Sequence, residues 1–91
     1  MKFSLEVGQL EKHTVQYEFN QLLGKLIIKV DDRTVKSNTR WFFEPRHEVH
    51  NFTIGAAEEM DVRIEKDRCL PYGQVNRIFV NNRLVRHYKG I

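Results

Sequence analysis

The chain has 91 residues, of which 41% are hydrophobic and 30% are charged, and its formal net charge is +3. Because domains typically run to about 100–150 residues, we assign residues 1–91 to a single domain. No segment approaches the roughly 18 consecutive apolar residues of a membrane span, and the first residues lack the apolar block of a secretory signal. A single cysteine, Cys69, excludes an intrachain disulfide framework. We therefore expect a cytoplasmic domain without a membrane partner.

Hydrophobic and polar residues alternate along most of the chain. In the first such segment Phe3, Leu5 and Val7 occupy alternate positions, which places them on one face of a strand. The pattern recurs at about ten-residue spacing, in residues 15–19, 26–30, 51–54, 60–65, 75–80 and 83–88. This rhythm predicts an all-β fold, a single antiparallel β-sandwich of about seven to eight short strands joined by hairpins.

Two hairpin turns are predicted in more detail. Residues 31–32 (Asp-Asp) and 81–82 (Asn-Asn) each separate two strand-like segments, and both residue types tolerate positive φ. Simple two-residue turns predict aliphatic pairs on one face of each hairpin: Ile28 facing Val35, and Ile78 facing Val85. Segments 28–36 and 78–86 therefore look alike. Since we find no repeat in the sequence around them, we interpret the likeness as similar turn sequences alone.

The histidines and the cysteine do not form a recognisable catalytic or metal-binding motif. Zinc sites usually have close ligand pairs at both ends of the motif, and here only His47 and His50 are close, while His13 and His87 lie far apart. We interpret these histidines as loop residues. Cys69 is flanked by cations, but no nearby residue supplies a base or an oxyanion donor. We therefore expect no enzymatic activity, no cofactor and no metal.

Two surfaces are candidates for binding. Phe79 and Leu84 share the face of the last hairpin opposite Ile78; an exposed pair would be a protein-contact site, and a covered pair would be core. The alternative is a nucleic-acid surface, because cations and aromatics mix around Trp41 as they do in single-strand binders. Its candidate residues are Arg40, Arg46, Arg83, Arg86 and Lys89. Against it, the carboxylates of residues 58–67 offset these cations. We favour a protein partner, with a homodimer as one form of it.

The order of short motifs along the chain resembles that of the Fas apoptotic inhibitory molecule family. The matching segments are His13, residues 15–19, Gly24-Lys25, Val30-Asp31-Asp32-Arg33, Trp41-Phe42-Phe43, Phe52-Thr53-Ile54-Gly55-Ala56-Ala57, Val62-Arg63-Ile64-Glu65, Ile78-Phe79-Val80-Asn81-Asn82-Arg83-Leu84 and Tyr88. The resemblance implies an antiparallel β-sandwich and a cytosolic, non-enzymatic protein that acts through protein contacts. Family members linked to death-receptor signalling carry two tandem β domains, whereas this chain has the length of one. The resemblance therefore brings over neither the anti-apoptotic role nor any site residue.

Overall fold

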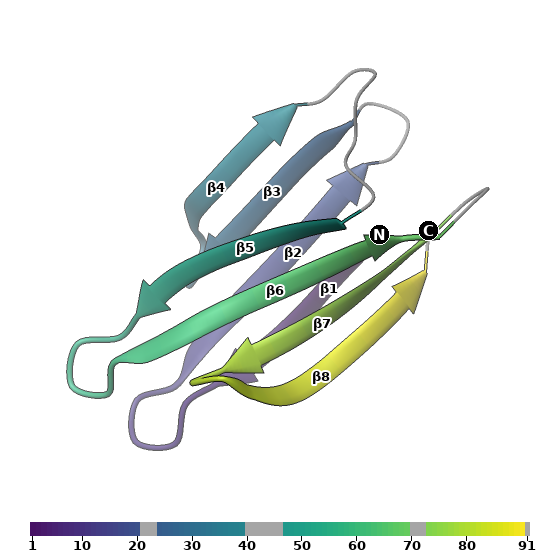
Figure 1. Cartoon of the computed structure of the whole chain (residues 1–91). Coiled ribbons are helices and arrows are strands. Elements are labelled where there is room, and N and C mark those ends of the chain that lie inside the picture. Colours follow the sequence, from purple (N-terminus) through teal and green to yellow (C-terminus); the bar gives the residue numbers. More distant parts are fainter. Residues whose placement is uncertain (21–23, 40–46, 70–72, 91) are drawn as a thin grey trace. The chain divides into compact units, whose positions relative to one another are not determined.

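The computed structural model describes residues 1–20, 24–39, 47–69 and 73–90. The chain forms two compact units, Met1–Glu44 and Pro45–Ile91. Within the described ranges every regular element is a β-strand, and each unit contains one four-stranded antiparallel sheet (Figure 1). The predicted all-β, antiparallel fold class is therefore confirmed, with eight strands. None of the described residues belongs to a helix that is long and apolar enough to cross a membrane.

Sheet 1 belongs to the first unit, and each of its strands pairs with the next one along the chain. Its strands are β1 (Lys2–Val7), β2 (His13–Asn20), β3 (Lys25–Val30) and β4 (Arg33–Thr39). Alternate residues of the first three strands form one buried apolar face: Phe3, Leu5, Val7, Val15, Tyr17, Phe19, Leu26, Ile28 and Val30. Phe3 and Tyr17 face each other across β1 and β2, and their stacked rings lie 4.7 Å apart between centroids.

Sheet 2 belongs to the second unit and has the same strand order. Its strands are β5 (His47–Ile54), β6 (Met60–Arg68), β7 (Gln74–Val80) and β8 (Arg83–Gly90). The buried apolar residues are Ile54, Met60, Val62, Ile64 and Ile78. Among the residues whose burial the structure describes, sheet 1 buries no polar ones, whereas sheet 2 also buries four: His50, Lys66, Gln74 and Asn76. His47 and His50 thus lie in a strand and not in a loop as predicted, and His50 is only 1% exposed.

Both predicted two-residue turns are present. Asp31 and Asp32 have φ of 50° and 65°, and Asn81 and Asn82 have φ of 50° and 66°. Positive φ at both central residues is the type I′ geometry, whose twist matches that of the flanking strands. The strands accordingly close on Val30 opposite Arg33 in one hairpin, and on Val80 opposite Arg83 in the other.

The aliphatic pairs predicted beyond these turns are wrong. Each hairpin has a register shift two residues before its turn, so that Ile28 faces Lys36 and Ile78 faces Arg86. Val35 and Val85 are the extra residues of these β-bulges and are 46% and 42% exposed. A bulge turns the bulged strand and leaves its extra residue unpaired. This is why neither valine joins the buried face.

The two sheets repeat each other well beyond their turns, so the interpretation of the likeness as turn sequence alone was also wrong. The cross-strand row Phe3–Tyr17–Ile28 of sheet 1 corresponds to the row His50–Ile64–Ile78 of sheet 2. Gly8 and Gly55 follow the first strand of each sheet, with φ of 105° and 94°.

The contacts of the turns repeat as well. Asp31 N donates to Thr14 O at 2.9 Å, and Thr14 N donates to the Asp31 carboxylate at 2.9 Å. In sheet 2, Asn81 N donates to Asp61 O at 2.8 Å, and Asp61 N donates to Asn81 Oδ1 at 2.9 Å. Each turn is thus anchored to the strand beside its hairpin by the same reciprocal pair of bonds.

Candidate binding surface on sheet 2

Phe79 and Leu84, the candidate protein-contact residues, lie directly opposite each other on β7 and β8. Leu84 is 50% exposed and Phe79 is half-buried. The pair is therefore accessible on the face of sheet 2 that points away from Ile78, which is fully buried. In sheet 1 the corresponding pair is Lys29 and Thr34. An apolar pair at this place is thus a property of sheet 2 alone.

Three of the five candidate cations lie on β8, the strand that forms one edge of sheet 2. Arg83, Arg86 and Lys89 are exposed, and within the described residues none of them forms an ion pair. Arg40 and Arg46, together with Trp41, lie outside the described residues. The geometry thus brings three predicted cations onto the strand that carries Leu84. We call Phe79, Arg83, Leu84, Arg86 and Lys89 the β8 surface. It includes both faces of this edge strand, because Leu84 and Lys89 lie on the face of Phe79, and Arg83 and Arg86 lie on the opposite one.

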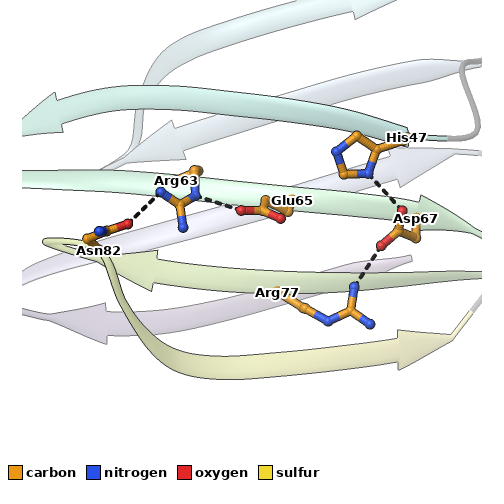
Figure 2. A network of polar contacts seen from close by, with 6 residues as sticks. All are labelled: His47, Arg63, Glu65, Asp67, Arg77 and Asn82. Carbon is orange, nitrogen blue, oxygen red and sulfur yellow. Dashed lines mark hydrogen bonds and ion pairs between the residues drawn. The ribbon is translucent and has the colours of Figure 1, made fainter.

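Arg63 covers part of this surface, which sequence reasoning missed. Its guanidinium lies 4.2 Å from the centroid of the Phe79 ring, in a cation–π contact. The same side chain forms an ion pair with Glu65, with Nε 2.7 Å from the carboxylate, and donates from Nη1 to Asn82 Oδ1 at 2.8 Å (Figure 2). One face of Phe79 is therefore occupied by a fixed arginine.

Asp67 is held in the same way farther along β6. Its carboxylate contacts His47 Nδ1 at 2.8 Å and accepts from Arg77 Nη1 at 2.7 Å (Figure 2). The hydrogen bond from His47, with a smaller contribution from Arg77, holds the pKa of Asp67 below its usual value. The period-two spacing of Arg63, Glu65 and Asp67 was the sequence signal for this network, because it places all three on one face of β6.

The charge balance of sheet 2 is consequently uneven. Glu65 and Asp67 are both committed to neighbouring cations. Asp67 is also the last acidic residue of the chain, and all later charged residues are Arg or Lys, namely Arg68, Arg77, Arg83, Arg86 and Lys89. The positive charge of β8 is therefore not balanced within its own strand or by Glu65 and Asp67 of β6. It is available to an acidic partner.

A hollow of about 570 Å³ lies beside the β8 surface. Arg63, Asn82, Asn51 and Asp61 are among its lining residues. Three of these already have side-chain partners: Arg63 contacts both Glu65 and Asn82, and Asp61 accepts from the Thr53 hydroxyl at 3.0 Å. The polar groups at its rim are therefore largely engaged with one another, and the hollow is a weaker candidate than the β8 surface.

The buried polar residues of sheet 2 form a row at the opposite face. Lys66 lies between Glu48 and Asn76 in the cross-strand register. His50 Nε2 lies 2.9 Å from a Glu48 carboxylate oxygen, and Asn76 donates to the Gln74 side chain at 2.9 Å. These side chains have the chemistry of a site but lack the solvent access that binding requires. Within the described part of the chain, no three His, Cys, Asp or Glu side chains are grouped to hold a metal ion.

Comparison of the chain with protein-family models, curated proteins and solved structures gives no match.

Proposed function

We propose that this protein is a non-enzymatic protein-binding module that acts in the cytoplasm and binds an acidic partner through the β8 surface. The observation that carries the proposal is an exposed Phe79–Leu84 pair on an edge strand whose cations, Lys89 on the same face and Arg83 and Arg86 on the other, have no counter-ion among the described residues. Apolar contact supplies affinity at such a surface, and unbalanced charge supplies association rate and selectivity. The resemblance to the Fas apoptotic inhibitory molecule family supports the same function, since proteins of that family act through protein contacts.

The second candidate function is nucleic-acid binding. Arg83, Arg86 and Lys89 favour it, because cations without counter-ions also suit phosphates. Sequence-tolerant single-strand binders add aromatic faces on which bases stack. Phe79, the aromatic residue of the β8 surface, has one face taken by Arg63. This makes an acidic protein the better match.

A homodimer through β8 is disfavoured on similar grounds. Two antiparallel copies of β8 would bring Arg83, Arg86 and Lys89 of one chain close to the same cations of the other. Like charges in facing strands destabilise the pairing.

The test is site-specific photo-crosslinking in extract of the source cell, with the photoreactive residue at position 84 or, as the matched control, at the corresponding position 34. A crosslinked protein specific to position 84 is then purified and its affinity measured. Leu84→Asp should weaken binding about tenfold or more, equivalent to about 1.4 kcal/mol, whereas Thr34→Asp should leave it unchanged.

Two results would contradict the proposal. One is equal crosslinking at positions 84 and 34. The other is binding of single-stranded oligonucleotides at about 50 mM salt that weakens steeply as salt rises, which would favour the nucleic-acid alternative.

A further inference from the structure

We infer that β8 recruits its partner by strand addition: an extended acidic segment pairs with the outer edge of β8 as a fifth strand of sheet 2. This inference rests on the proposed function and names the form and chemistry of the partner. Strand addition uses main-chain hydrogen bonds for affinity and alternate side chains for specificity.

The edge geometry supports a main-chain docking site. β8 ends the strand order β5-β6-β7-β8, so its outer edge has no neighbouring strand within the sheet. From Arg86 to Gly90 it pairs with β7 in unbroken register, because the bulge lies nearer to the turn. β8 contains no proline, so none of the alternate residues that face the outer edge lacks the N–H that a fifth strand requires. A regular edge without a neighbouring strand in its own sheet is a template for another strand.

The charged side chains of β8 determine which charge on an added strand is favourable. In the register, Arg86 faces Ile78 and Lys89 faces Val75, so the two cations extend toward opposite faces of the sheet. A neighbouring strand therefore meets positive charge on both of its faces. Opposite charges in facing positions stabilise a strand pair. An extended segment rich in Glu or Asp matches this pattern, whereas a basic segment is repelled.

The corresponding edge strand of sheet 1 shows what is particular to β8. β4 carries Arg33 and Lys36 at the places of Arg83 and Arg86. However, its turn residues Asp31 and Asp32 are acidic where those of sheet 2 are neutral asparagines. Lys36 also already has a partner. The two edges thus share a backbone but differ in charge, which makes β4 an internal control.

Strand addition also distinguishes the partner from a nucleic acid. A polynucleotide has phosphates but no N–H and C=O groups in strand register, so it satisfies the cations and leaves the edge groups of β8 unpaired. An acidic peptide satisfies both. The experiment must therefore separate the contribution of charge from that of main-chain pairing.

The probe is a short, capped peptide of repeated Glu-Glu-Thr-Thr, which as a strand carries glutamates on both of its faces. It is added to ¹⁵N-labelled protein at low salt. Amide signals and hydrogen exchange are followed in β8 and in β4. We expect the peptide to shift the amides of residues 86–90, to protect those among them whose N–H points to the outer edge, and to leave residues 33–37 unchanged. Arg86→Ser combined with Lys89→Ser should weaken binding about fivefold or more, while Arg33→Ser should leave it unchanged.

Three outcomes would overturn strand addition. The first is equal binding of the same peptide with alternate backbone nitrogens methylated, which retains charge but loses N–H donors. The second is an equal response of β4 and β8. The third is a thymidine oligonucleotide that shifts the β8 amides more strongly than the peptide does. In the first case the proposed protein binding through the β8 surface stands, because it depends on the crosslinking result at position 84 and not on main-chain pairing.

Discussion

The two sheets have the same strand order, turns and bulges, but different side chains on equivalent positions. On the buried face, Phe19 pairs with Leu26 in sheet 1, and Lys66 pairs with Asn76 in sheet 2. Phe3 likewise corresponds to His50, which is equally buried. The shared features are those of the backbone: positive-φ turn pairs and a glycine after the first strand. The comparison indicates that the register is fixed by turns and alternation, whereas the chemistry of either face can vary.

The exposed faces of the two sheets also differ in chemistry, but here sheet 2 is the more apolar one. Sheet 1 has Lys29 and Thr34 where sheet 2 has Phe79 and Leu84. Sheet 2 therefore carries polar groups on its buried face and an apolar pair on its exposed face. Departures from the usual burial pattern tend to occur at functional sites. This contrast supports the proposal of a binding surface on sheet 2.

The largest expected effect on stability comes from giving the buried face of sheet 1 the residue type found at the equivalent position of sheet 2. Phe19→Lys removes a buried ring and places a charge opposite apolar Leu26, so we expect a loss of at least about 4 kcal/mol in the free energy of unfolding. In sheet 2, Lys66 lies opposite Glu48 on the neighbouring strand. The double change Glu48→Gln and Lys66→Met removes both of these charges and should leave the free energy of unfolding unchanged or raise it. Urea denaturation measures both effects.

The stabilities of these variants test whether the buried faces of the two sheets are interchangeable. A loss above about 3 kcal/mol in the double variant would show that the charges hold sheet 2 together, and the two faces would then not be interchangeable. Hydrogen exchange of β6 and β7 in Phe19→Lys also tests the single-domain prediction. If residues 1–91 unfold as one domain, protection in sheet 2 falls together with that in sheet 1.

A second contrast lies at the starts of β2 and β6. His13 contacts both Glu11, at 2.8 Å, and Asp31, whereas Met60 and Asn81 occupy the corresponding places of His13 and Asp31. The hydrogen bond to Asp31, followed by that to Glu11, raises the pKa of His13. Bonds from Thr14 N and from His13 lower the pKa of Asp31.

The pH dependence follows from these directions. The contribution of His13 is complete below its unfolded pKa of 6.5 and is lost as the pH rises through its higher folded pKa. The contribution of Asp31 is present above 3.8 and is lost as the pH falls through its lower folded pKa. The melting temperature of the native protein should therefore exceed that of His13→Gln most between these limits, with the difference shrinking above pH 6.5. Met60→Leu should show a difference that does not change across the same range; a His13→Gln difference that is equally flat would contradict the assignment.

Much of the fold was predictable because alternation and turn residues are local signals. The buried residues of β1, β2 and β3 follow the period-two pattern, and both two-residue hairpin turns have the expected positive φ. The bulges at Val35 and Val85 were not predictable, because a bulge shifts the register without changing the residue types around it. Hydrophobicity patterns also could not find the buried place of Lys66, since burial of a lysine depends on partners from other strands.

For the candidate site, the sequence identified Phe79, Leu84 and the cations of β8. It did not reveal that these cations lack counter-ions within the described part of the chain, whereas other cations of sheet 2 are paired. The ion pairs of Glu65 and Asp67 link residues on different strands, and only the register reveals that these carboxylates are already in use. Sequence counting set those carboxylates against the cations of the chain as a whole. The geometry separates them into a paired network on β6 and an unbalanced edge on β8.

The smallest expected effect compares the two turns. Asp32 and Asn82 have nearly equal φ, of 65° and 66°, where glycine is the favoured residue of a type I′ turn. Within the described residues Asp32 has no side-chain partner, so Asp32→Gly should raise the free energy of unfolding by about 0.5 kcal/mol. Asn82→Gly also removes the bond from Arg63 at 2.8 Å, and the two effects should nearly cancel. Thermal denaturation in the Arg63→Ala background separates them: there Asn82→Gly should become as favourable as Asp32→Gly. A clear loss of stability from Asp32→Gly would mean that the turns, which we take as the shared determinant of both sheets, are stabilised by something other than their backbone conformation.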